Sequence, residues 1–293
     1  MIAVKPLSPD FVAEIEGVDL RQPVPPEVLA EIVSALDRYG VVVFHDQTID
    51  DEQQIAFSSL FGPLEISRAT LRPGAKLRIS QQMSDISNLD ENNRIMEAND
   101  YRRMSGLANR LWHTDSSFKR TPAKYSMLSA RVVPGSGGDT EFADMRAAYD
   151  ALPEKARAEI EDLVAIHSIF HSRATTGFTD FSPEERAGLP PVPQRLVRTH
   201  PGSGRKSIYI ASHASEIVGM PVPEGRMMLL DLMDHATRPQ FVHAHRWRKG
   251  DLVIWDNRCT LHRARPFDAA EARDMRRTTV ADDRPTVEQA MVA

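Results

Sequence analysis

Short apolar runs that end at turn residues recur along this chain, and they restrict its fold more than any other feature. Three of them are rich in β-branched and aromatic residues: Val41 to Phe44, Tyr125 to Val133 and Leu252 to Trp255. Runs of this kind between turns are typical of buried strands. Patterns typical of helices lie between them, at 28–39, 154–163 and 223–236. We therefore expect an α+β, mainly β fold with an antiparallel core and helices around it.

The length of the chain suits one large domain. Its 293 residues are 41% apolar and 26% charged, which is ordinary for a globular protein with a sizeable core. We expect a single domain over 1–293, with a substrate lid at 65–110 and a flexible tail at 284–293. The lid segment is polar and without periodicity, and an irregular segment of that length is commonly a functional loop. Residues 172–195 are rich in proline, threonine and glycine and are also expected to form a loop.

Charge and cysteine content argue against several kinds of partner and location. The formal net charge is −5, whereas nucleic-acid-binding domains are usually basic. The apolar runs are too short to cross a bilayer, and the first residues lack the apolar stretch of a secretory signal. The single cysteine, Cys259, cannot form an intrachain disulfide, which suits a reducing compartment. We expect a cytoplasmic protein that binds a small molecule rather than nucleic acid or a membrane.

The most informative local pattern is the pair His113 and Asp115. Residues i and i+2 of a strand point to the same face, so the two side chains can hold one metal ion together. Taken alone the pair is weak, because a chain with ten histidines can contain a His-x-Asp by chance. His262 follows the apolar strand at 252–255 and supplies a third candidate ligand, since a buried imidazole there needs a partner. Two histidines and one carboxylate are the ligands of the facial triad of non-haem Fe(II).

Two arginines downstream of His262 add a second chemical signal. Arg273 and Arg277 are four residues apart, which places them on one face of a helix or of a strand. The planar fork of arginine suits carboxylates, so the two can serve two anionic ligands in one cavity. The alternative is a solvated basic face, which is the commoner explanation for such a cluster.

These residues lie in longer segments that resemble the TauD/TfdA family of Fe(II)/2-oxoglutarate-dependent dioxygenases. The segments are 112–118, 137–142, 144–149 and 255–263. Further segments resemble the subgroup that acts on 2,4-dichlorophenoxyacetate, at 197–206, 212–215 and 224–227. The resemblance runs from about residue 7 to residue 283. It implies a double-stranded β-helix, which is a jelly-roll core flanked by helices.

The resemblance also implies roles for the metal and for the cosubstrate. His113, Asp115 and His262 would bind Fe(II). Arg273 would pair with the distal carboxylate of 2-oxoglutarate, and the Thr140 hydroxyl would donate to the same group. Three positions on the metal then remain for 2-oxoglutarate, which takes two, and for O2.

Four more residues are candidates for the substrate. Arg277 would meet the substrate carboxylate or the cosubstrate, and Asn109, His200 and His213 would line the pocket. For the last three a purely structural role is an equal alternative. We assign no function to a further group of residues: His167, His171, His243 and Cys259.

The reaction implied by the resemblance is the hydroxylation of a small carboxylic acid. An aryloxyacetate such as 2,4-dichlorophenoxyacetate would give a phenol, glyoxylate, succinate and CO2. Alternatives are a taurine or alkylsulfonate dioxygenase, an oxygenase of aryloxypropionates or of another aromatic acid, and a non-catalytic jelly-roll module that binds a small acid. The segment 65–108 departs most from the subgroup and leaves the substrate open. A homodimer is a further expectation from the family.

Overall fold

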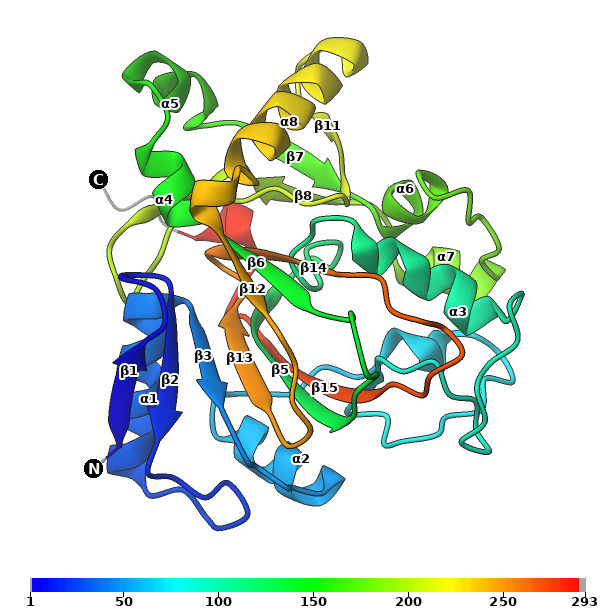
Figure 1. The fold of residues 1–293 in the computed structure, drawn as a ribbon. Coiled ribbons are helices and arrows are strands. Elements are labelled where there is room, and N and C mark those ends of the chain that lie inside the picture. The colour runs from blue at the N-terminus through cyan, green and yellow to red at the C-terminus, as the bar shows by residue number, and fades with distance from the viewer. Residues whose placement is uncertain (1, 290–293) are drawn as a thin grey trace.

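The structure, a computed structural model, describes residues 2–289, in which eight α-helices surround mainly antiparallel sheets (Figure 1). A seven-stranded sheet has the order β1-β2-β3-β13-β5-β15-β4, and a three-stranded sheet has the order β12-β6-β14. The seven strands are β1 (Ala3–Pro6), β2 (Val12–Glu16), β3 (Val41–Phe44), β13 (Leu252–Asp256), β5 (Ala123–Val132), β15 (Asp274–Ala281) and β4 (Ser84–Asp85). The three are β12 (Val242–His245), β6 (Thr140–Asp144) and β14 (Thr260–Ala264).

Smaller sheets and the helices cover this core. A second three-stranded sheet consists of β11 (Ala214–Ile217), β7 (Val164–His167) and β8 (Val192–Arg195), and β9 (Val197–Thr199) pairs with β10 (Lys206–Ile208). The helices are α1 (Pro26–Tyr39), α2 (Asp51–Ser59), α3 (Tyr101–Gly106), α4 (Met145–Asp150), α5 (Glu154–Ile160), α6 (Ile169–Ala174), α7 (Pro183–Gly188) and α8 (Val222–Ala236). The expected antiparallel β core with helices around it is confirmed; among the strand pairings of residues 2–289, only that of β2 with β3 is parallel.

The two central sheets pack through apolar side chains. Phe142 of β6 and Trp255 of β13 lie in one buried cluster, with ring centroids 5.5 Å apart. Strand β13 has neighbours on both edges, β3 and β5, and all five of its residues are buried. This position explains why the sequence from Leu252 to Trp255 is continuously apolar rather than alternating.

Residues with the usual helix-end signals bound α1, and a capping pair starts α2. Helix α1 has a proline in its first turn and ends at Gly40, whose φ of 78° is the left-handed conformation that glycine adopts most easily. At the start of α2 the Asp50 side chain accepts from the Gln53 backbone, and the Gln53 side chain accepts from the Asp50 backbone. This reciprocal pair satisfies two backbone donors that the helix leaves free.

The segment 172–195 is not the loop that its composition predicts. It contains the end of α6, all of α7 and strand β8. Helix α7 starts with Ser182, whose hydroxyl accepts from the backbone of Glu185, while the Glu185 side chain accepts from the backbone of Ser182. The proline and glycine in this segment therefore bound a short helix, so the prediction was wrong.

The expected lid, residues 65–110, is ordered by ion pairs despite having little regular structure. It contains β4, α3 and two 3-10 helices, Arg68–Leu71 and Leu107–Arg110. Arg78 is buried and donates to Asp85 and to Asp274 of β15, at 2.8 and 2.7 Å. Tyr101 donates to Glu185 of α7 at 2.6 Å. The segment is thus fastened both to the main sheet and to the region beside α7.

The expected flexible tail does not begin at residue 284. The Thr286 hydroxyl donates to Gln194 of β8 at 2.6 Å and accepts from the backbone N–H of Arg195 at 3.0 Å. Thr286 is therefore held against β8, and the last residues of the predicted tail, 290–293, lie outside the described residues.

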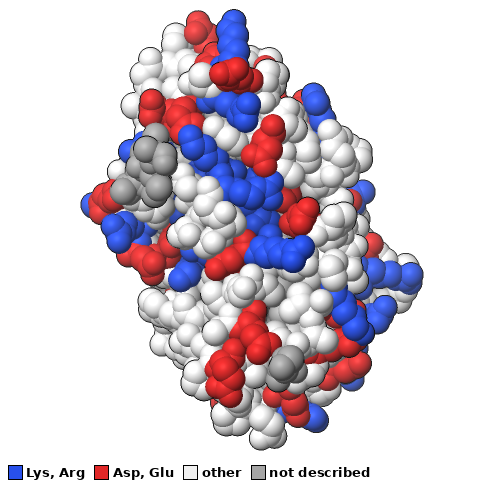
Figure 2. Space-filling model, turned by 90° about the vertical axis from the view of Figure 1, so that its left-hand side faces the viewer, with Lys and Arg blue, Asp and Glu red and all other residues white. Residues whose placement is uncertain are grey.

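The outer surface carries charges of both signs. On the side drawn in Figure 2, a band of lysine and arginine side chains runs between acidic ones. Among residues 2–289, no helix combines the length and the hydrophobicity that crossing a membrane requires.

Candidate metal centre

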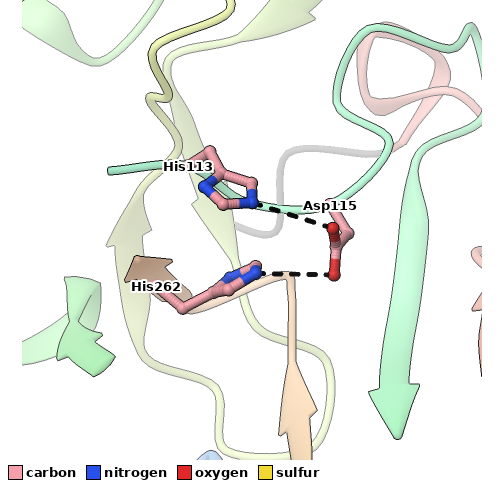
Figure 3. A group of neighbouring side chains, drawn as sticks. All are labelled: His113, Asp115 and His262. Atoms are coloured by element: carbon pink, nitrogen blue, oxygen red, sulfur yellow. Dashed lines mark ion pairs between the residues drawn. The ribbon is translucent and has the colours of Figure 1, made fainter. Parts of the chain in front are cut away.

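Side chains from two distant parts of the sequence, His113 with Asp115 and His262, meet at one place in the structure. The backbones of His113 and His262 exchange two hydrogen bonds, of 3.0 and 2.7 Å, as a single bridge between the 112–118 segment and β14. This bridge places the two imidazole rings 4.2 Å apart between centroids. Asp115 turns its carboxylate toward both rings (Figure 3), with Oδ1 4.0 Å from His113 Nε2 and Oδ2 3.7 Å from His262 Nε2. The three groups converge as a metal-binding triad requires.

The protonation of the triad suits a metal ion. His113 Nδ1–H donates to the Leu111 carbonyl at 2.8 Å, which leaves the lone pair of Nε2 facing Asp115. Burial lowers the pKa of His113 to about 4, and it also lowers the pKa of His262. Burial alone would raise the pKa of Asp115, but Arg277 and the two imidazoles lower it to about 2. At neutral pH the site therefore offers two neutral imidazoles and one carboxylate.

A network of hydrogen bonds orients the Asp115 carboxylate. Ser126 of β5 donates to Asp115 Oδ2 at 2.7 Å and accepts from Asn257 Nδ2 at 3.0 Å. Asn257 Oδ1 in turn accepts from the backbone N–H of Asp115 at 3.0 Å and from the Trp255 indole at 3.1 Å. Such outer partners fix the orientation of metal ligands. Neither Ser126 nor Asn257 was predicted, because their role depends on the contact between β5 and the turn after β13.

Arg277 of β15 lies at the triad itself. Its Nη1 donates to Asp115 Oδ1 at 2.5 Å. From the sequence, Arg277 is expected to meet an anionic substrate or cosubstrate; in the structure it binds the carboxylate of the triad. A metal ion bound by Asp115 would compete with the guanidinium for the same oxygen.

A cavity of about 540 Å³ opens beside the triad. The expected lid supplies much of its wall, and His113 and Asp115 lie in it together with four predicted ligand-binding residues: Asn109, His213, Arg273 and Arg277. The cavity thus joins the metal triad to the expected lid segment.

Arg273 is a buried cation without an anionic partner among the described residues. Its side chain is 5% exposed, and it donates only to the carbonyl groups of Ile86 and Gly138, at 3.0 and 3.5 Å. Burial lowers the pKa of Arg273 to about 10. Because a buried charge is costly unless it is paired, a carboxylate in the cavity would complete this environment.

Thr140 is placed less directly. It is buried at the start of β6 and is not among the residues that line the cavity. Its hydroxyl oxygen accepts from the Trp247 indole at 3.0 Å, which leaves the hydroxyl hydrogen to donate elsewhere. Its contact with a cosubstrate carboxylate stays a prediction.

The expectation that His200 lines the pocket is corrected. His200 is fully buried outside the cavity, with Nε2 2.9 Å from Asp256 Oδ2. The backbone N–H of Ser203 donates to His200 Nδ1 at 3.1 Å, so Nε2 carries the proton that binds Asp256. His200 therefore satisfies a buried carboxylate, which is the structural alternative named for it.

One charged residue near the cavity was missed. Arg173 of α6 is 5% exposed and donates through Nη2 to Asn109 Oδ1 at 3.1 Å. Burial lowers the pKa of Arg173 to about 9. Because the guanidinium holds the amide oxygen, the NH2 group of Asn109 is the part left for a ligand. No motif signals Arg173, and only its distance from Asn109 reveals it.

Comparison with known proteins agrees with this geometry. Residues 3–279 match the family described as "Taurine catabolism dioxygenase TauD, TfdA family". The alpha-ketoglutarate-dependent 2,4-dichlorophenoxyacetate dioxygenase of Cupriavidus pinatubonensis (strain JMP 134 / LMG 1197) is 47% identical over 284 residues, covering 96% of this chain and 98% of that protein. The (S)-phenoxypropionate/alpha-ketoglutarate-dioxygenase of Sphingobium herbicidovorans is 39% identical, covering 98% and 97%.

A solved structure is similar over the whole molecule. The crystal structure of AAD-2 in complex with Mn(II) and N-oxalylglycine has 50% sequence identity and a TM-score of 0.90, covering 99% of this chain and 100% of that one. Sequence and structure therefore agree over almost the entire length of the chain. The chain belongs to the TauD/TfdA family.

Proposed function

We propose that this protein is an Fe(II)- and 2-oxoglutarate-dependent dioxygenase that hydroxylates an aryloxyacetate such as 2,4-dichlorophenoxyacetate. The observation that carries the proposal is the convergence of His113, Asp115 and His262 beside a cavity that holds the unpaired cation Arg273. The names of the two similar dioxygenases and the Mn(II) and N-oxalylglycine of the AAD-2 structure support the same chemistry. In this proposal the two packed central sheets are the double-stranded β-helix of the family.

The residues of the triad fit a divalent iron ion. Two neutral imidazole nitrogens and one carboxylate are the donor set of non-haem Fe(II), and Nε2 of His113 is oriented by its bond to the Leu111 carbonyl. When bound, iron supplies the activation of O2 that couples the oxidation of 2-oxoglutarate to succinate and CO2 with hydroxylation of the substrate. The protein orients both acids and excludes water from the cavity.

Arg273 binds the distal carboxylate of 2-oxoglutarate in this proposal. Its two terminal nitrogens already donate to Ile86 and Gly138, so the guanidinium is held in one orientation in the cavity wall. The Thr140 hydroxyl, whose oxygen is occupied by Trp247, has its hydrogen free for the same carboxylate. A fixed, buried cation selects a dianionic cosubstrate over a neutral one.

Arg277, Asn109 and His213 bind the substrate in this proposal. Arg277 reaches the edge of the triad, so a carboxylate held there places the adjacent methylene group beside the metal. For an aryloxyacetate that methylene lies between the carboxylate and the ether oxygen. Its hydroxylation gives a hemiacetal, which collapses to a phenol and glyoxylate.

A panel of acids tests the proposal. The protein loaded with Fe(II) and supplied with 2-oxoglutarate and O2 should release succinate together with a phenol from aryloxyacetates. The His113→Ala variant is the control and should release neither. Sulfite from taurine would indicate the sulfonate alternative, and turnover of aryloxypropionates alone would indicate the related propionate activity. Absence of 2-oxoglutarate-dependent O2 consumption with every acid would overturn the proposal in favour of a binding module.

A further inference from the structure

The turn that follows Asp115 contains a residue in an unusual backbone conformation. Ser116 has a φ of 54°, in the left-handed region, and it is 6% exposed. Apart from glycines, the only other residues with a positive φ among residues 2–289 are Asp46 and Asn93. Aspartate and asparagine adopt this conformation more readily than serine does, because their short polar side chains can hydrogen-bond locally. Ser116 is therefore strained and needs contacts that hold it.

One carboxylate contacts both ends of this turn. The Ser116 hydroxyl donates to Oε2 of Glu65 at 2.7 Å, and Nζ of Lys119 donates to the same oxygen at 2.6 Å. Within the turn, the backbone N–H of Lys119 donates to the Ser116 carbonyl at 2.9 Å. The Glu65 side chain is 10% exposed, so these charge-assisted bonds are largely shielded from water. Glu65 thus closes the turn from Ser116 to Lys119.

The backbone of Glu65 is itself fixed to the main sheet. Its N–H donates to the Thr279 carbonyl of β15 at 2.8 Å. Glu65 is also the first residue of the expected lid, and it lines the cavity together with Ser116 and Lys119. The carboxylate therefore extends from a fixed point beside β15 to the turn that follows the metal ligand.

The bonds made by Asp115 itself do not hold this turn. Asn257 binds the backbone N–H of Asp115, and Ser126 binds its carboxylate. The φ of Ser116 sets the direction in which the chain leaves Asp115. If Ser116 relaxed to an ordinary negative φ, either the turn or Asp115 would have to shift.

We propose that Glu65 is a positioning residue, which holds Ser116 in the left-handed conformation and thereby keeps Asp115 oriented toward the metal. The inference rests on the metal centre of the proposed function, and it adds a lid residue that supports this centre. Movement of residue 65 away from the turn would release Ser116. Order at the start of the lid and affinity for the metal are therefore coupled, and each favours the other.

Two substitutions of Ser116 separate the hydrogen bond from the strain. Ser116→Ala and Ser116→Gly both remove the hydroxyl, but only glycine adopts the left-handed conformation without a penalty from Cβ. We expect Mn(II) affinity to fall about tenfold in Ser116→Ala, as for the loss of an outer partner of a ligand, and to stay within about twofold of the wild type in Ser116→Gly. Calorimetric titration of the metal-free protein measures both. Equal affinities in the two variants, or a larger loss in Ser116→Gly, would overturn the proposal.

Substitutions of Glu65 test the other side of the bond. Glu65→Ala should also weaken Mn(II) binding about tenfold. In the Ser116→Gly background the same change should have almost no effect, because no strain is left for the carboxylate to hold. Glu65→Gln keeps an acceptor oxygen for the Ser116 hydroxyl and should lose less affinity than Glu65→Ala. A tenfold loss from Glu65→Ala in the Ser116→Gly background would show that Glu65 does not act through Ser116.

The control is Glu91→Ala, which removes the same charge from the same cavity wall. Glu91 pairs with Lys76 and Arg102 of the lid rather than with the turn at 116–119. This variant should leave Mn(II) affinity unchanged. None of these measurements needs turnover. A wild type that binds no Mn(II) would overturn the proposed function as well, whereas normal binding that Ser116→Ala and Glu65→Ala leave unchanged would overturn only this inference.

Discussion

Two clusters of buried residues in this protein have almost the same composition but different chemistry. His113, Asp115 and His262 form one cluster, and the other consists of His200, Asp256 and Cys259. In each, the candidate ligand atoms lie within 4.8 Å of one another. Only the first borders the cavity. Composition and spacing alone therefore do not identify the metal site.

The difference lies in the cation that accompanies each carboxylate. Asp256 receives two bonds from the buried Arg258, at 2.9 Å from Nε and 2.5 Å from Nη2, and a third from His200. Burial also raises the pKa of the Cys259 thiol, which keeps the sulfur protonated and a poor ligand. Asp115 instead pairs with Arg277, which borders the cavity, where an anionic ligand would offer it a second partner. We infer that a buried carboxylate can bind a metal ion where the arginine paired with it can bind another anion instead.

Exchanging the carboxylate of the first cluster should have the largest effect. Asp115→Asn removes the only anionic ligand, so we expect Mn(II) affinity and turnover to fall by more than the roughly 100-fold typical of losing an outer partner of a ligand. Calorimetric titration of the metal-free protein measures this. Asp256→Asn, the matched change in the second cluster, should still bind Mn(II) normally. A comparable loss of affinity in both variants would remove the distinction between the clusters.

The same exchange in the second cluster should instead reduce stability. Asp256→Asn leaves Arg258 as a buried cation without its carboxylate, which typically costs about 3–5 kcal/mol of the free energy of unfolding. Urea unfolding of the metal-free protein measures the loss. If the variant were as stable as the wild type, the Asp256–Arg258 ion pair would not be the stabilising interaction of the second cluster.

Removal of the Arg277 cation should affect the binding of metal and of substrate in opposite directions. In Arg277→Met the Asp115 carboxylate no longer has a competing partner, so Mn(II) should bind tighter, by about tenfold if one charge-assisted hydrogen bond is relieved. The KM for the acid should rise. Weaker Mn(II) binding in this variant would mean that Arg277 supports the ligand geometry rather than competing for it.

The stability of the metal-free protein should also depend on pH. The pKa of His113 is lowered by burial to about 4, from an ordinary value of about 6.5. Between these values the unfolded chain takes up a proton that the folded chain does not, so the metal-free protein loses stability as the pH falls from about 6.5 to about 4. His113→Gln should reduce this dependence in urea unfolding by the contribution of one proton, whereas His167 and His262, whose pKa values burial also lowers, should keep the rest of it. An unchanged slope would assign the acid sensitivity to other groups.

The sequence predicts the triad but not the reason for its geometry. Strand alternation was invoked for His113 and Asp115, yet His113 occupies a single bridge and Asp115 already lies in the following turn. The resemblance to the family predicted both ligands, because the segment 112–118 on which it rests includes this turn. The resemblance could not place His200, because the carboxylate that binds His200 belongs to Asp256, at the end of β13 and distant in the sequence. The local sequence signals predicted α1, β3 and β13 correctly. The residues of these elements themselves determine where each begins and ends and that it is buried.

The anchoring of the lid has a consequence for how this protein could be re-engineered. The salt bridges of Arg78 and the bond from Tyr101 to Glu185 hold the segment 65–110 at its attachment points. Other residues of the same segment, such as Ile66, Leu77 and Gln82, face the cavity without taking part in those bonds. A mutant library confined to these three positions can therefore vary the shape of the cavity wall while the loop keeps its course, which makes them the natural starting point for changing which acids the cavity admits.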